Sequence, residues 1–93
     1  MTSSPGQDDA ELILTLYMRH GCHLCEDMHT ALLENIQNKA LSIKTVDIDL
    51  DDELKARFND YVPVLMHQNT EICHYYLDLQ ALSRYLAQHD YQI

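Results

Sequence analysis

The fold is decided by residues 11–28, which read ELILTLYMRHGCHLCEDM. The run Leu12–Tyr17 is almost continuously apolar, which is typical of a strand buried on both faces, as in a parallel sheet. Gly21 interrupts that run, and apolar residues then return at the spacing of a helix. We therefore predict a buried strand followed by an amphipathic helix from about Leu24 to Asn38.

The rest of the chain continues to alternate between strands and helices. In chain order we first predict a strand over Leu41–Ile48 and a short helix that buries Leu54 and Phe58. A strand over Val62–Met66, a turn at 68–70 and a strand over Glu71–Tyr76 follow. Asp78 then caps a last helix that carries Leu79, Leu82 and Leu86. The register of the second strand stays open, because its alternation slips near Lys44 and Thr45. The order βαβαββα predicts an α/β fold, a four-stranded mixed sheet flanked by helices, with the first two strands parallel and the last two in an antiparallel hairpin.

The length of 93 residues allows one domain, which we place at 11–90. Residues 1–10 are mostly polar, and we interpret them as a disordered N-terminal arm. They lack the basic start and the apolar core of a secretory signal, so we expect a cytoplasmic protein whose thiols are kept reduced.

The charge of the chain narrows the class of its partners. Six basic residues stand against fifteen acidic ones, for a formal net charge of −9. Proteins that bind nucleic acid usually cluster Lys and Arg, so we expect no nucleic-acid partner. No apolar run approaches the ~20 residues that span a bilayer, so we also expect no membrane partner. We expect a monomer, and if its charge steers an encounter, the partner carries a basic patch.

The chemistry of the chain is predicted to lie at Cys22-His23-Leu24-Cys25. Two cysteines separated by two residues, at a strand-to-helix junction, form a redox motif. The junction places Cys22 at the start of the helix, where free N–H groups and the helix dipole stabilise a thiolate. We predict dithiol–disulfide exchange, with Cys22 as the nucleophile and Cys25 as the resolving thiol.

Two other interpretations of the pair stay open. It could be half of a zinc site, with ligands from His20, His23 or His29, although the only other cysteine, Cys73, offers no second pair with ligand spacing. It could also be a vestigial pair in a binding domain.

Residues outside the cysteine pair, taken together with it, resemble the pattern of a known family. Leu16-Tyr17 leads through Arg19 into the cysteine pair, and Tyr61-Val62-Pro63-Val64-Leu65 follows later in the chain. This pattern resembles the glutaredoxin-like proteins of the thioredoxin superfamily, over about residues 11–88. The resemblance implies a thioredoxin-like fold and a disulfide oxidoreductase that serves electron transport and cell redox homeostasis. It also implies that Pro63 is in cis against the cysteine pair and that the backbone of Val62 meets an extended substrate.

The chain departs from that family where specificity is set. Glutaredoxins commonly carry Pro-Tyr or Pro-Phe between the cysteines, and a Gly-Gly-Asp-like turn that grips glutathione before the last helix. Here the corresponding stretches are His23-Leu24 and Tyr75-Tyr76-Leu77-Asp78, of which Asp78 alone matches the turn. We expect no bound cofactor, and glutathione is a candidate reductant whose binding motif is incomplete. The partners expected are a protein or small-molecule disulfide and a reducing partner.

Three side chains near the motif have roles that the sequence leaves open. Arg19 could lower the pKa of Cys22, meet a carboxylate of the substrate, or lie solvated in its loop. His23 could stabilise the thiolate when protonated, or simply be exposed. Cys73 is interpreted as a small apolar residue that fills space in the fourth strand, with a regulatory thiol as the alternative.

Overall fold

The computed structural model describes residues 11–93 and shows an α/β fold built on one four-stranded mixed sheet. The predicted arm at 1–10 lies outside the described residues. The elements in chain order are β1 (Leu12–Met18), α2 (His23–Asn35), β2 (Leu41–Asp47), the 3-10 turn η1 (Ile48–Leu50), α3 (Asp52–Phe58), the 3-10 turn η2 (Asn59–Tyr61), β3 (Val64–His67), β4 (Thr70–His74) and α4 (Leu79–Gln88). The predicted order of strands and longer helices is confirmed, and the two 3-10 turns are additional.

The sheet has the strand order β2-β1-β3-β4. β1 and β2 are parallel and pair without interruption from Leu12 opposite Leu41 to Met18 opposite Asp47. The slip in the sequence pattern of β2 therefore causes no bulge. β3 runs antiparallel to β1, and β4 runs antiparallel to β3, as the hairpin prediction requires.

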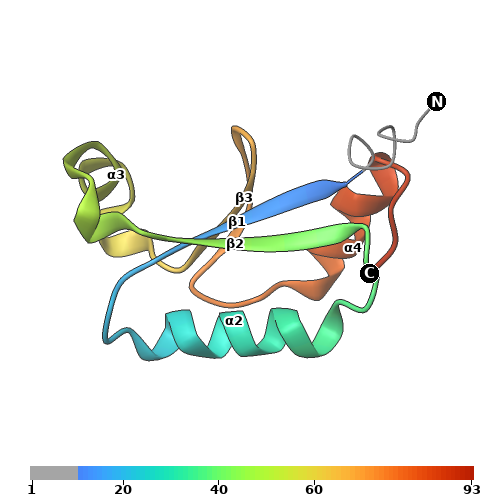
Figure 1. The fold of residues 1–93 in the computed structure, drawn as a ribbon, viewed down its shortest axis with the longest axis horizontal. Coiled ribbons are helices and arrows are strands. Elements are labelled where there is room, and N and C mark those ends of the chain that lie inside the picture. The colour runs from blue at the N-terminus through green and yellow to red at the C-terminus, as the bar shows by residue number, and fades with distance from the viewer. Residues whose placement is uncertain (1–10) are drawn as a thin grey trace.

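The helices cover the two faces of the sheet unequally. In Figure 1, α2 and α4 lie on one side of the sheet and the shorter α3 lies on the other. The larger core cluster joins β1 to α2 and α4 through Leu14, Met28, Leu32 and Leu86, which are at most 2% exposed. Burying side chains of this size contributes roughly 1.5–3 kcal/mol each, so this face holds the sheet and the two helices together.

A second, smaller core holds α3 against the opposite face. It contains Ile48, Phe58, Val64 and Met66. The ring of Phe58 also stacks on Tyr17 of β1, with ring centroids 4.5 Å apart. These contacts fix α3 at the end of the sheet where β1 leads into α2 (Figure 1).

Several element boundaries differ from the predictions, and three of the differences have a clear structural setting. α2 ends at Asn35 and not at Asn38, because Ile36 turns to an extended backbone and packs against the core. β3 begins at Val64, so Pro63 precedes the strand and does not open it. β4 ends at His74, because Tyr75 takes a positive φ of 66° and leaves the extended conformation.

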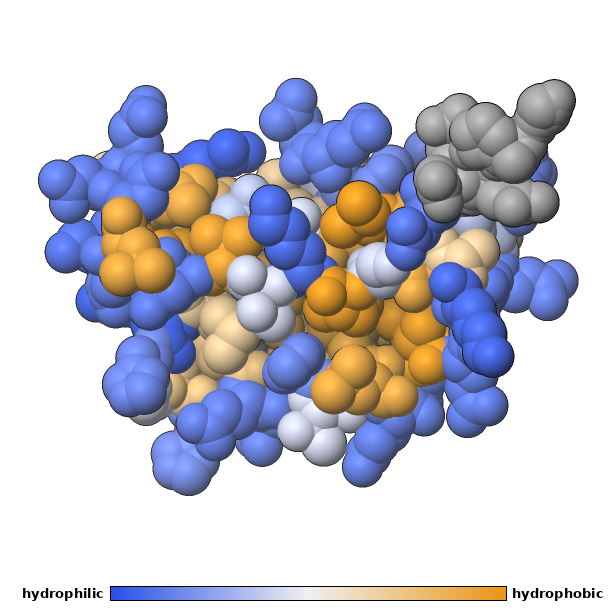
Figure 2. Space-filling view, in the orientation of Figure 1, coloured by the Kyte–Doolittle hydropathy of each residue, from blue (hydrophilic) through white to orange (hydrophobic). Residues whose placement is uncertain are grey.

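Hydrophilic residues surround the molecule in Figure 2, and apolar residues gather in the middle of the face that it shows. This matches a chain whose acidic residues greatly outnumber its basic ones. In the part of the chain from 11 to 93, none of the helices combines the length and apolar character needed to cross a membrane.

Candidate functional site

Cys22 occupies the N-cap of α2, at the end of the loop that follows β1. Its extended backbone ends the loop, and its Sγ accepts a hydrogen bond from the backbone N–H of Cys25 at 3.1 Å. A cap side chain pairs with one of the N–H groups that the first helical turn leaves free. The Cys22 sulfur therefore lies at the positive end of the helix dipole, as the sequence predicts.

Cys25 lies one turn further into α2 and is completely buried. Cys22, by contrast, is partly exposed. The two residues form a disulfide across 5.2 Å between their Cα atoms. The pair thus presents one sulfur toward solvent and holds the other inside the protein, which is the asymmetry that an attacking thiol and a resolving thiol need.

Pro63 lies beside the cysteine loop through the pairing of the strands. Tyr17 pairs with Val64, so Pro63, one residue earlier, lies next to the point where β1 enters that loop. The Val62–Pro63 peptide bond is cis, as the resemblance implies, and Pro63 is buried. The carbonyl of Pro63 accepts a hydrogen bond from the Tyr75 N–H at 2.8 Å, which ties the loop after β4 to this position.

Arg19 is bound within the protein and does not extend freely into solvent. Its guanidinium makes two contacts with the Asp49 carboxylate, at 2.9 and 3.1 Å, and its Nη1 donates to the Asn59 side chain at 3.5 Å. The hydrogen bond and the charge of Asp49 raise the pKa of Arg19, and the charges of Asp60 and Asp47 act in the same direction. The positive charge of Arg19 is thus surrounded by carboxylates.

The other predicted site residues lie on two different elements. His23 is exposed in the first turn of α2, directly after Cys22. Asp78 is the N-cap of α4, and its carboxylate accepts a hydrogen bond from the Ala81 N–H at 3.0 Å, which confirms the predicted cap. Val62 is partly buried and ends the turn η2. The structure therefore gives Asp78 a structural partner inside its own helix.

The loop from Tyr75 to Leu77 passes close to the first turns of α2. A cleft of about 280 Å³ separates them, lined by Leu24, Asp27, Ala31, Tyr75, Tyr76 and Leu77. Leu24, which lies between the two cysteines in sequence, places one end of the cleft in the first turn of α2. Among the lining residues that the structure describes, Asp27 is the only charged one, and Tyr76 is 69% exposed at the rim.

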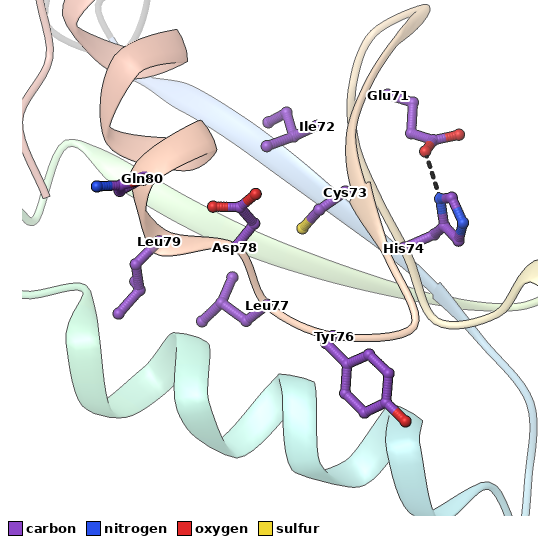
Figure 3. A pocket seen from close by; sticks show the side chains of 9 residues that line it. All are labelled: Glu71, Ile72, Cys73, His74, Tyr76, Leu77, Asp78, Leu79 and Gln80. Atoms are coloured by element: carbon purple, nitrogen blue, oxygen red, sulfur yellow. Dashed lines mark hydrogen bonds and ion pairs between the residues drawn. The ribbon is translucent and has the colours of Figure 1, made fainter.

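A larger and shallower hollow of about 660 Å³ follows β4 and the start of α4. Figure 3 shows the Cys73 sulfur and the Asp78 carboxylate on one side of β4, and the hydrogen bond between Glu71 and His74 on the other. Burial raises the pKa of the Cys73 thiol, and the side chain packs in the main core. Cys73 is therefore a buried residue of the fourth strand, as the sequence interpretation places it.

The sequence interpretation missed Asp49 and Tyr76. A signal for Asp49 exists: in the parallel pairing of Leu12 with Leu41, Arg19 and Asp49 follow the adjacent ends of β1 and β2. Tyr76 was placed within the fourth strand, and no local pattern marks it as the rim of a cleft.

Potential metal ligands around the cysteine pair do not converge. Within 11–93, no three His, Cys, Asp or Glu side chains are grouped so that they could hold a metal ion. The histidines near the motif in sequence therefore do not complete a site with the two thiols in this arrangement.

Comparison with known proteins identifies the family of this chain, which has the cysteine pair, the cis proline and the strand order described above. The model of the glutaredoxin-like domain (DUF836) matches residues 13–87. The chain belongs to this glutaredoxin-like family. Among curated proteins, none matches it by sequence.

Solved structures support the family and the fold. The glutaredoxin-like chain is 35% identical to protein Ne2328 from Nitrosomonas europaea, with a TM-score of 0.72, over 81% of this chain and 91% of that one. It is 31% identical to target protein XcR50 from X. campestris, with a TM-score of 0.65, over 81% of this chain and 96% of that one. The thioredoxin Deadhead from Drosophila melanogaster is 21% identical, with a TM-score of 0.54 over 90% and 86% of the two chains, and shares the fold.

Proposed function

We propose that this glutaredoxin-like protein is a thiol–disulfide oxidoreductase that works by dithiol exchange through Cys22 and Cys25. The observation that carries the proposal is the asymmetry of the pair. Cys22 is partly exposed and caps α2, whereas Cys25 is buried one turn away and close enough to form a disulfide with it. Proximity to the helix N-terminus favours the thiolate, which is the nucleophilic form of cysteine.

In the reduced protein, the Cys22 thiolate attacks one sulfur of a substrate disulfide. A mixed disulfide forms, and the other substrate sulfur leaves as a thiolate that takes up a proton. The Cys25 thiol then loses its proton and attacks Cys22, which releases the second substrate thiol. The substrate gains two electrons and two protons, and the protein is left with the Cys22–Cys25 disulfide, which a dithiol reductant returns to the reduced state.

Trapping of the mixed disulfide tests this mechanism. The purified Cys25→Ser protein, reduced and mixed with a neutral synthetic peptide disulfide, should accumulate a peptide adduct on Cys22 that mass spectrometry detects. The Cys22→Ser protein should accumulate no adduct. Cys73→Ser is the matched control, because Cys73 is buried away from the pair, and it should complete the exchange as the wild type does. Equal trapping by both cysteine variants, or by neither, would reject the assigned roles.

The zinc alternative predicts a different set of results. Purified protein would then contain stoichiometric zinc that is lost in Cys22→Ser, and the reduced wild type would exchange with no peptide disulfide. A vestigial pair would bind no zinc and would fail to form the intramolecular disulfide under mild oxidant.

A further inference from the structure

The electrostatic surroundings of the cysteine pair are strongly acidic. Eight of the fifteen acidic residues lie in the first two turns of α2 or between the end of β2 and η2, at the end of the molecule where β1 enters α2 (Figure 1): Glu26, Asp27, Asp47, Asp49, Asp51, Asp52, Glu53 and Asp60. The basic residues in these segments are Lys55 and Arg57, and Arg19 lies in the loop between β1 and α2. Charges of one sign around a site create a field that attracts oppositely charged substrates and repels others.

The arginine nearest to the cysteines in sequence already has partners within the protein. Arg19 donates from Nε and Nη2 to the Asp49 carboxylate and from Nη1 to the Asn59 side chain. A carboxylate of a substrate would have to replace Asp49 in this bidentate contact. Because both oxygens of Asp49 are already in place, the protein's own carboxylate occupies the bidentate site that Arg19 would offer to an anion.

The cleft beside Leu24 also favours an apolar or positively charged group over a negatively charged one. Its lining is apolar except for the exposed carboxylate of Asp27, and neither Lys nor Arg contributes to it. The loop on its far side carries Tyr75 and Tyr76. The carboxylate of Asp78, which follows this loop, is held by the N–H of Ala81. A group that occupies the cleft therefore meets aromatic and aliphatic surface with a negative charge at its edge.

We propose that the substrate of the Cys22–Cys25 pair is a disulfide in a protein or peptide segment that carries a basic side chain and an apolar side chain next to its cysteine. This inference rests on the proposed function and names its substrate class. The apolar side chain occupies the cleft beside Leu24, and the basic one pairs with Asp27 at the edge. Glutathione disulfide is a poor substrate, because its carboxylates outnumber its ammonium groups and Asp49 already holds the guanidinium of Arg19.

The test uses three synthetic peptide disulfides of equal length that differ only in the residue next to cysteine, which is Lys, Gln or Glu beside a common Leu. Reduced protein is mixed with each peptide, and with glutathione disulfide, in single-turnover experiments at low and high salt. At low salt the Lys peptide should react about tenfold or more faster than the Glu peptide, since steering of this kind changes association rates by factors of 10 to 1,000. The ratio should shrink at high salt, where exposed charges are screened.

The outcomes of this experiment separate the two proposals. If the Gln peptide reacts but the Glu peptide or glutathione disulfide reacts as fast as the Lys peptide, the substrate class is wrong and the proposed function stands. If none of the four disulfides reacts, the proposed function is wrong, and the substrate class falls with it.

Substitutions on α2 test whether Asp27 is the residue that sets the preference for the Lys peptide. Asp27→Asn should lower the Lys-to-Glu rate ratio several-fold, and Asp27→Lys should reverse the preference. Glu34→Gln removes the same charge from an exposed position near the other end of the same helix and should leave the ratio unchanged. A ratio that falls equally in Asp27→Asn and Glu34→Gln would show that net charge alone sets the preference and would overturn the assigned role of the cleft.

Discussion

Arg19 and Asp49 form a bidentate ion pair between the loop that leaves β1 and the turn that follows β2. Parallel pairing brings the ends of these two strands together, so residues 30 positions apart in sequence become neighbours at the entrance to α2. Arg19 lies three residues before Cys22, yet its charge is directed to Asp49 and not left free for the sulfur or for a substrate.

Removal of the Asp49 charge should release Arg19 for anions. We expect Asp49→Asn to raise the single-turnover rate with glutathione disulfide several-fold at low salt, because the guanidinium of Arg19 then attracts the carboxylates of glutathione. Stopped-flow measurement of thiol loss gives the rate. Asp52→Asn, an exposed charge on α3 that is not paired with Arg19, is the control. Equal gains in both variants would show a nonspecific effect of net charge.

Cys73 should be far less reactive than Cys22 in the folded, reduced protein. It is 9% exposed, and burial raises the pKa of its thiol, so little thiolate forms near neutral pH. Alkylation by iodoacetamide at pH 7.5, followed by mass spectrometry, should modify Cys22 first and Cys73 on the order of tenfold or more slowly. In urea the difference should vanish. Modification of Cys73 at the rate of Cys22 in the native protein would contradict its burial.

Asp78 has a capping role that can be separated from its charge. Its carboxylate accepts a hydrogen bond from the Ala81 N–H, so Asp78→Ala should lower the free energy of unfolding by about 1 kcal/mol. Asp78→Asn keeps an oxygen that can cap the helix and should cost much less. Urea denaturation of the two variants makes the comparison. If both substitutions cost the same, the charge of Asp78 and not its cap stabilises α4.

The sequence predicted those parts of the fold that depend on local patterns. The apolar run of β1, the spacing of Leu24, Met28 and Leu32 in α2, and the cap at Asp78 each follow from side-chain periodicity or hydrogen-bonding chemistry. The parts that it missed depend on contacts between distant segments. The partner of Arg19 follows from the register of β1 and β2, which the sequence of β2 left open.

The backbone of the loop after β4 is a second feature that depends on a contact between distant segments. Tyr75 adopts a positive φ, which is unusual for a residue other than glycine, and its N–H is bound to the Pro63 carbonyl. The hydrogen bond comes from the tertiary structure, so the sequence alone suggested that the strand would continue through Tyr76. The cleft beside Leu24 exists because the chain turns there.

His67 makes the stability of the protein depend on pH. Its Nδ1 is hydrogen-bonded with the hydroxyl of Tyr85 on α4, and its ring lies 5.4 Å from the ring of His89, between centroids. Burial lowers the pKa of His67, and the charge of His89 lowers it further. In the unfolded chain a histidine titrates near its ordinary value of about 6.5. As pH falls below that value, the unfolded chain binds the proton first, so the folded state loses stability until pH passes the lowered pKa of His67.

Urea denaturation between pH 7.5 and pH 5.5 measures this effect. His67→Gln keeps a polar side chain opposite Tyr85 but has no titrating ring, so its free energy of unfolding should decline less over this range than that of the wild type. His20→Gln, which removes an exposed histidine from the loop before Cys22, should decline as the wild type does. Because the carboxylates are the same in all three proteins, the difference between the variants isolates the contribution of His67. Identical pH dependence in the wild type and in His67→Gln would show that the contact between β3 and α4 does not sense protonation.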